Sequence, residues 1–94
     1  MDNVLELPPV LDLVAASALL EAFLRRRGER LVVDGGAVQR LGAQCLQVLM
    51  AARAAWAADE QNFRFKNGSE DFLATLELLG VPPANLTYAK ETAT

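Results

Sequence analysis

The residues that could do chemistry are few, and they lie near the middle of the chain. The stretch VVDGGAVQRLGAQCLQVLM, residues 32–50, reads as a strand, a glycine turn and a helix. Small α/β proteins often place reactive groups at such a junction, because the helix N-terminus presents free N–H groups. Cys45 lies near the expected start of this helix, where a thiol can have a lowered pKa. The chain has no His, however, so neither a Cys-His nor a Ser-His-Asp pair can be built.

The other candidate groups have simpler explanations. Cys45 falls on the apolar face of its helix, so we expect a small buried residue. The acids Glu70 and Asp71 follow Ser69 and read as the first turn of a helix, where carboxylates favour the helix dipole. Gly35 and Gly36 match neither a GxGxxG nor a P-loop spacing. With one Cys and no His, we expect no metal site. The sequence predicts no enzyme, no cofactor and no catalytic residue.

Composition and charge narrow the class of protein. The 94 residues suit one domain, 1–94, with 89–94 as a flexible tail. The apolar fraction is 52%, which argues against disorder. A net charge of -3 and a pI near 4.8 argue against a nucleic-acid partner. No signal peptide and no run of roughly 20 apolar residues is visible, so we expect a cytoplasmic protein without membrane insertion.

The elements that must position these residues alternate between strand and helix. A strand at 4–7 is ended by two prolines, and its edge could pair across a homodimer. A helix follows at 14–27, capped by Asp12. The apolar run at 30–34 predicts a central parallel strand covered on both faces. The second helix is expected at 43–58. The apolar stripes of the two helices are predicted as Ala16, Leu19, Leu20, Phe23 and Leu24, and as Cys45, Leu46, Leu49, Ala52, Arg53 and Trp56.

The second half of the chain continues the alternation. Residues 62–66 alternate apolar and polar, as in a strand with one buried face near the sheet edge. Ser69 caps a third helix, whose apolar face comprises Phe72, Leu73, Leu76 and Leu79, and Gly80 ends it. Residues 86–88 could form a last short strand. The fold class is therefore α/β, a single domain with a mostly parallel sheet of about four strands and three or four helices.

Three stretches of the chain, taken in order, resemble the STAS domain, the fold of bacterial anti-sigma-factor antagonists and of sulfate-transporter tails. LDLVAA at 11–16 is similar to the family segment that leads into the first helix. LVVDGGAV at 31–38 is similar to its central strand, and SEDFLATLELLGV at 69–81 to its C-terminal helix. The resemblance covers residues 4–81 and implies a STAS-like fold.

The resemblance also implies a function for the opening stretch. Anti-sigma-factor antagonists carry an Asp-Ser-Ser/Thr-Gly turn at the start of the second helix, and a partner kinase phosphorylates its first Ser. Aligned on Asp34 and Val38, this turn falls on residues 42–45. Ala43 then occupies the phosphoserine position and Cys45 the Gly position. A chain of this type would dock a protein partner without being phosphorylated there. The implied partner-binding residues are Arg40, Leu41, Gly42, Ala43, Gln44 and Gln47.

The resemblance leaves two settings open. The first is a bacterial signalling module that docks a regulatory kinase, either a chemotaxis histidine kinase or an anti-sigma factor. The second is a small STAS subunit of an ABC-type phospholipid transport complex. Relatives of the second kind commonly keep Thr or Ser in the turn, whereas this chain has Ala43.

Overall fold

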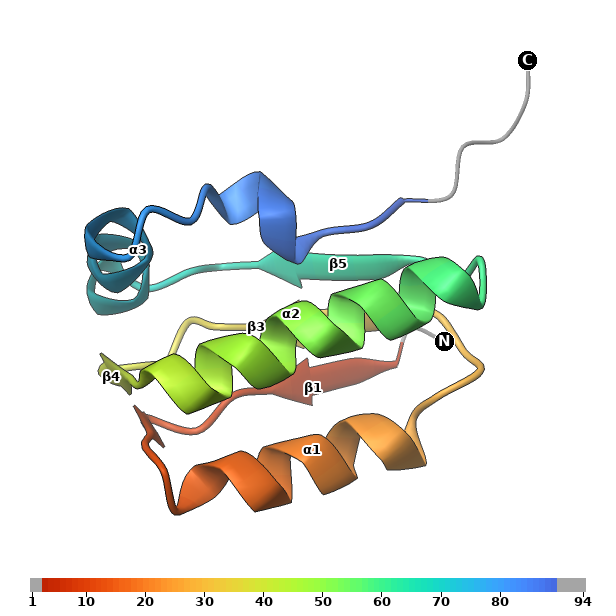
Figure 1. Cartoon of the computed structure of the whole chain (residues 1–94), viewed down its shortest axis with the longest axis horizontal. Coiled ribbons are helices and arrows are strands. Elements are labelled where there is room, and N and C mark those ends of the chain that lie inside the picture. The colour runs from red at the N-terminus through yellow and green to blue at the C-terminus, as the bar shows by residue number, and fades with distance from the viewer. Residues whose placement is uncertain (1–2, 90–94) are drawn as a thin grey trace.

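A parallel three-stranded sheet forms the centre of the molecule. The structure is a computed structural model, and it describes residues 3–89. The strands β1 (Val4–Glu6), β3 (Leu31–Asp34) and β5 (Phe63–Lys66) lie in the order β1-β3-β5, and both pairs are parallel. The predicted strand at 30–34 is therefore confirmed as the central one (Figure 1). β1 is an edge strand, and its pairing across a homodimer stays a prediction.

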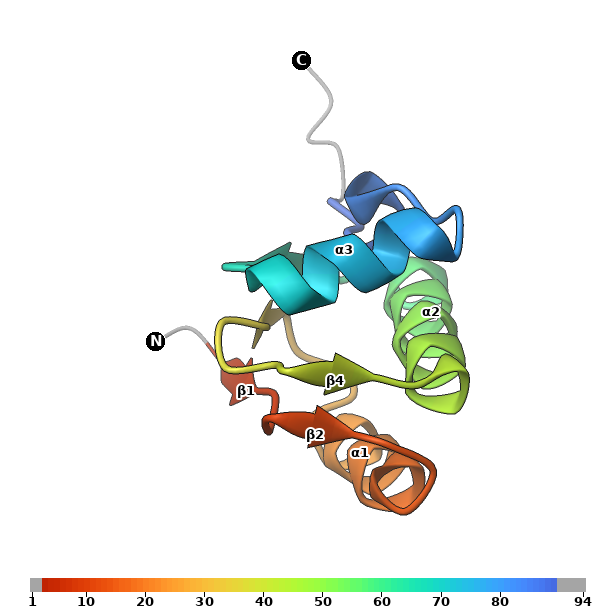
Figure 2. The ribbon, with the colours of Figure 1, turned by 90° about the vertical axis from the view of Figure 1, so that its left-hand side faces the viewer.

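Two helices cover one face of this sheet. The helices α1 (Ala15–Arg25) and α2 (Ala43–Ala58) lie on the same side of it, as the side view shows (Figure 2). Leu31 and Val33 point into this layer and are buried, whereas Val32 between them is half-buried. The expectation that this strand is covered on both faces was therefore wrong. No helix of residues 3–89 lies over the second face, so the strand alternates in burial despite its apolar sequence.

A cluster of aromatic side chains packs α1 and α2 against the sheet. The ring of Trp56 lies 6.1 Å from that of Phe23 and 5.5 Å from that of Phe63, centroid to centroid. Tilted and edge-on pairs of this kind add stability beyond the area they bury. The indole N–H of Trp56 donates to the carbonyl of Glu29 at 2.6 Å, so its polar atom is satisfied. The stripe predicted for α2 is buried as expected, except that Arg53 is half-buried and donates to the Thr87 carbonyl.

A second, smaller parallel sheet was not predicted. It joins β2 (Val10–Leu11) to β4 (Arg40–Leu41). In the view of Figure 2 it lies in front of the central sheet, at the carboxyl ends of the central strands. The Pro9 carbonyl accepts from the Gln39 N–H at 2.7 Å, and the Leu11 carbonyl accepts from the Gly42 N–H at 2.7 Å. Two-residue strands carry no readable alternation, so only contacts between distant segments reveal them. The small sheet places the chain before α1 against the start of α2.

The third helix and the last segment complete the α/β fold. α3 is Glu70–Leu78, and Ser69 caps it as predicted by accepting from the Phe72 N–H. Gly80 follows with a φ of +71°, the left-handed conformation expected after a helix end. The last strand expected at 86–88 does not form: Leu86 ends the 3₁₀ helix η1 (Pro83–Leu86), and Tyr88 makes a single bridge to Phe63. Residues 90–94 of the expected tail lie outside the described residues.

The fold class is confirmed, with slightly fewer strands in the central sheet than expected. The apolar faces of α1 and α3 are narrower than their sequences predict. Leu19 and Phe23 of α1 are buried, but Leu20 and Leu24 are 47% and 57% exposed. In α3, Phe72 and Leu76 are buried, whereas Leu73 and Leu79 are 40% and 47% exposed. These leucines are apolar residues that the domain does not cover with its own elements.

Candidate functional site

The predicted turn lies at the very start of α2. Gly42 is the N-cap residue, with extended backbone and no side chain to cap the helix, and Ala43 is the first helical residue. A Cβ at Gly42 would lie 3.2 Å from the Leu11 carbonyl oxygen, so glycine permits the close approach of the β2 segment. The start of α2 therefore has no side-chain cap, and the small sheet holds its backbone in place through the bond from the Gly42 N–H to the Leu11 carbonyl.

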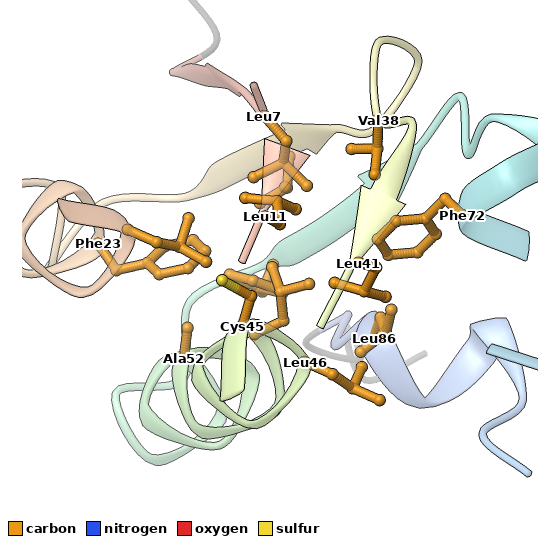
Figure 3. Close-up of a cluster of buried hydrophobic side chains, with 14 of the residues drawn as sticks. Leu7, Leu11, Phe23, Val38, Leu41, Cys45, Leu46, Ala52, Phe72 and Leu86 are labelled. Carbon is orange, nitrogen blue, oxygen red and sulfur yellow. The ribbon is translucent and has the colours of Figure 1, made fainter. Parts of the chain in front are cut away.

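The structure brings five of the six predicted residues to one surface. Arg40, Ala43, Gln44 and Gln47 are exposed, and Gly42 is half-buried between them. We call these five residues the turn surface. Leu41 corrects the prediction: it is 7% exposed and packs into the core beside Phe72 (Figure 3). β4 directs alternate side chains to opposite sides, so Arg40 faces out while Leu41 faces in and is not available to a partner.

A groove between α1 and α2 extends the turn surface. Gln44 and Gln47 line it from α2 together with Val48 and Ala51, and Ala16 and Leu20 line it from α1. We call it the interhelical groove. Sequence reasoning missed Leu20 as a surface residue because it placed Leu20 in the apolar stripe that packs on the core. The signal was the apolar content of the helix, since eight of its eleven residues are apolar and one packed face needs only about three to four per two turns.

The exposed face of α2 carries no charge. Arg53 is the only charged side chain of this helix, and its Nε donates to the Thr87 carbonyl at 3.1 Å. The residues that α2 exposes are Ala43, Gln44, Gln47, Met50, Ala51, Ala54 and Ala58. A solvated helix face normally carries charged side chains. An uncharged face beside an apolar groove is typical of a surface that another protein covers.

Two exposed apolar side chains lie next to the turn surface. Leu13 and Val14, just before α1, are 68% and 87% exposed. The segment that carries them is held against the start of α2, because the thiol of Cys45 donates to the Asp12 carbonyl at 3.3 Å. Sequence analysis placed Val14 inside the first helix, whereas α1 begins one residue later. Both residues add exposed apolar area to the segment that is held against the start of α2.

The geometry gives no reactive role to Cys45. Its side chain is fully buried (Figure 3), and burial raises the pKa of the thiol, with a smaller contribution from the charge of Asp12. A nucleophilic thiol needs the opposite, a lowered pKa and access to substrate. The prediction of a small buried residue is confirmed.

The glycine turn after β3 is filled by its own contacts. The Asp34 carboxylate accepts from the Gly36 N–H at 2.9 Å and from the Asn67 amide at 3.2 Å, and these bonds lower its pKa. A Cβ on Gly35 would lie 2.4 Å from the ring of Phe65, so that ring occupies the space beside the turn. Among residues 3–89, no group of three or more His, Cys, Asp or Glu side chains could hold a metal ion.

The strands and helices together define a small α/β domain with a mostly parallel sheet. Comparison with protein families makes the class specific: the family model described as "Mlab, STAS domain" matches residues 2–83, and the chain belongs to the STAS domain family. STAS domains are protein-interaction modules and are generally not enzymes. Searches of curated proteins and of solved structures returned no significant match. No helix within residues 3–89 has the length and apolar character needed to cross a bilayer.

Proposed function

We propose that this STAS domain is a non-enzymatic module of bacterial signalling that docks a regulatory kinase in the cytoplasm. The kinase would be a chemotaxis histidine kinase or an anti-sigma factor, and it would bind the turn surface and the interhelical groove. The observation that supports this proposal is Ala43, an exposed methyl group on the first residue of α2. By resemblance, this is where the anti-sigma-factor antagonists carry their phosphorylated Ser.

The chemistry of Ala43 sets how the module is controlled. A phosphoserine would bring a charge of about −2 onto a helix face that exposes no charged side chain and would oppose docking by its desolvation cost. Alanine has no hydroxyl to accept a phosphoryl group. Phosphorylation at this position therefore cannot regulate docking through the turn surface. Control of docking depends instead on the amount or the state of the partner.

A negative charge introduced at Ala43 tests the docking surface. We expect Ala43→Glu to weaken partner binding at least tenfold, because the carboxylate must be desolvated in the interface. The fold should survive, since an acid in the first turn of a helix is stabilising by about 0.3–1 kcal/mol. Titration calorimetry with the purified partner measures the loss of affinity, and thermal unfolding checks stability.

The matched control is Ala54→Glu, the same change at an exposed residue of the same helix, three turns further on. It should bind the partner within about twofold of the unmodified chain if docking centres on the turn surface. Equal losses for the two variants, or no loss for either, would place the docking site elsewhere on the molecule.

The partner itself is found by pull-down of the tagged protein from cells that carry its gene, with mass spectrometry of the captured proteins. Recovery of a histidine kinase or an anti-sigma kinase supports the proposal. Recovery of the ATPase of an ABC-type phospholipid transporter would replace it with the second candidate function. The matched family is named Mlab and not after the anti-sigma-factor antagonists, so its description does not favour the kinase over the transporter. Capture of neither class would contradict both.

A further inference from the structure

A second groove lies between α3 and the segment that follows it. Leu73 and Glu77 line it from α3, and Gly80, Val81, Pro82 and Pro83 form the facing wall. We call it the α3 groove. The Val81 N–H donates to the Leu76 carbonyl at 2.9 Å, and the Asn85 N–H donates to the Pro82 carbonyl at 2.9 Å. The first bond holds the wall against the end of α3 and the second fixes the turn within the wall, so the groove is preformed.

The floor of the α3 groove is apolar, Glu77 is the acidic residue of its lining, and Glu70 lies outside the groove on the same face of α3. Leu73 is 40% exposed there, beside Val81 and the two prolines. Glu70, Leu73 and Glu77 follow the i, i+3, i+7 spacing, so they share one face of α3. Neither Lys nor Arg lines the groove, and the salt bridges of residues 3–89 leave both of these glutamates unpaired. The surface thus has the charge and apolar pattern that complement a basic, amphipathic segment.

We propose that the α3 groove binds a basic amphipathic helix of a partner protein. Apolar residues of that helix would pack on Leu73, Val81 and Pro82, and its Lys or Arg side chains would face Glu70 and Glu77. An amphipathic helix in an apolar groove is a recurring recognition mode, and complementary charge fixes its orientation. This surface shares no residue with the turn surface or the interhelical groove, so the inference goes beyond the proposed function.

The spacing and the wall both favour a helix over an extended strand. Glu70 and Glu77 lie two helical turns apart, roughly 10 Å at 1.5 Å per residue. Basic residues at i and i+7 of a partner helix have the same separation, and apolar residues at i+3 and i+4 lie between them. Pro82 and Pro83 have no backbone N–H, so the wall cannot extend a ladder of strand hydrogen bonds.

A designed peptide tests the charge pattern. The probe is a synthetic helical peptide with Lys at i and i+7 and Leu at i+3 and i+4, and its control carries Glu in place of Lys. With isotope-labelled protein, we expect the Lys peptide to shift NMR signals of α3 and residues 80–83, and the Glu peptide to leave them unchanged. Glu77→Lys should weaken binding at least tenfold. Glu29→Lys makes the same charge change where the side chain forms no hydrogen bond within residues 3–89, and it should bind within twofold.

A second pair of variants tests the apolar floor. Leu73→Asn should also weaken the Lys peptide about tenfold. Leu78→Asn alters a leucine of the same helix that is 86% exposed and does not line the groove, and it should leave binding intact. Thermal unfolding of each variant separates lost binding from lost folding. Equal effects of Glu77→Lys and Glu29→Lys, or of the two leucine variants, would overturn the proposal, as would NMR shifts outside this groove.

Discussion

Single side chains decide which helix starts can interact with a partner. At the start of α2, Gly42 and Ala43 offer neither a cap nor a hydroxyl, so the first turn stays open. Ser69 at the start of α3 differs, because its Oγ accepts from the Phe72 N–H at 3.0 Å and donates to the Val38 carbonyl. Val38 is buried, so this second bond satisfies an oxygen that water cannot reach. The Ser69 hydroxyl is therefore structural, whereas Ala43 is exposed and has no side-chain hydrogen-bonding group.

Removing the Ser69 hydroxyl should therefore cost stability. We expect Ser69→Ala to lower the free energy of unfolding by about 1–2 kcal/mol, because a helix cap and a bond to a buried carbonyl are both lost. Ser17→Ala, at an exposed position in the first turn of α1, should change it by less than about 0.5 kcal/mol. Urea denaturation followed by circular dichroism measures both. A similar loss for the two variants would mean that Ser69 does not act as a cap.

At the scale of elements, α1 and α2 each pack one face on the core. Their outer faces form the walls of the interhelical groove. Adjacent leucines of α1 divide between the two environments: Leu19 is buried and Leu20 lines the interhelical groove. Hydrophobic side chains outside the core contribute little to the free energy of folding. Leu20 is therefore available to stabilise a complex without being needed for the fold.

This division predicts opposite effects for two neighbouring substitutions. Leu19→Ala should lower the free energy of unfolding by about 2–5 kcal/mol, because it leaves a cavity in the core. Leu20→Ala should lower it by less than about 1 kcal/mol and should instead weaken partner binding. Denaturation and calorimetry on the two variants check this. A large loss of stability in Leu20→Ala, or unchanged binding, would remove the interhelical groove from the docking surface.

At the scale of the whole molecule, titratable groups join distant segments. The guanidinium of Arg27, after α1, donates to the carboxylate of Asp59, after α2, at 2.9 Å, and this bond lowers the pKa of Asp59. Asp34 has a lowered pKa through its bonds to Gly36 and Asn67. Cys45 has a raised pKa because it is buried. No His is present, so no imidazole titrates between these groups.

Stability should accordingly be flat in the middle of the pH range and fall at both ends. A carboxyl with a lowered folded pKa stabilises the fold above its unfolded value, about 3.9, and this contribution is lost as the pH falls through the folded pKa. The Cys45 thiol contributes in the opposite sense, below its unfolded pKa, and loses that contribution as the pH rises above about 8.5. Thermal unfolding between about pH 2 and 10 should show a plateau from about 5 to 8.

Two variants test which groups cause the loss of stability at low and at high pH. Asp59→Asn should reduce the acid-side decrease, because it removes the carboxyl whose pairing with Arg27 is lost on protonation. Cys45→Ala should reduce the alkaline decrease. A strong pH dependence between about 6 and 7 would contradict this account, since no group with a shifted pKa titrates there.

The sequence by itself determined the local structure. Helix caps, glycine stops and apolar periodicity depend on neighbouring residues, and they predicted the bounds of α2, the central place of β3, the cap at Ser69 and the burial of Cys45. The STAS resemblance was visible for the same reason, because its three stretches are contiguous. These features follow from spacing along the chain, which any reader of the sequence can measure.

Only the tertiary structure decided which apolar residues the domain covers. The small sheet that pairs β2 with β4 turns Leu41 inward and holds the segment before α1 against the start of α2, through hydrogen bonds between segments far apart in sequence. Leu20 and Leu73 look like core residues in their helices, yet each lies at a boundary where no further element packs on it. Burial is a property of the assembled layers, so both grooves appear only when the helices are placed on the sheet.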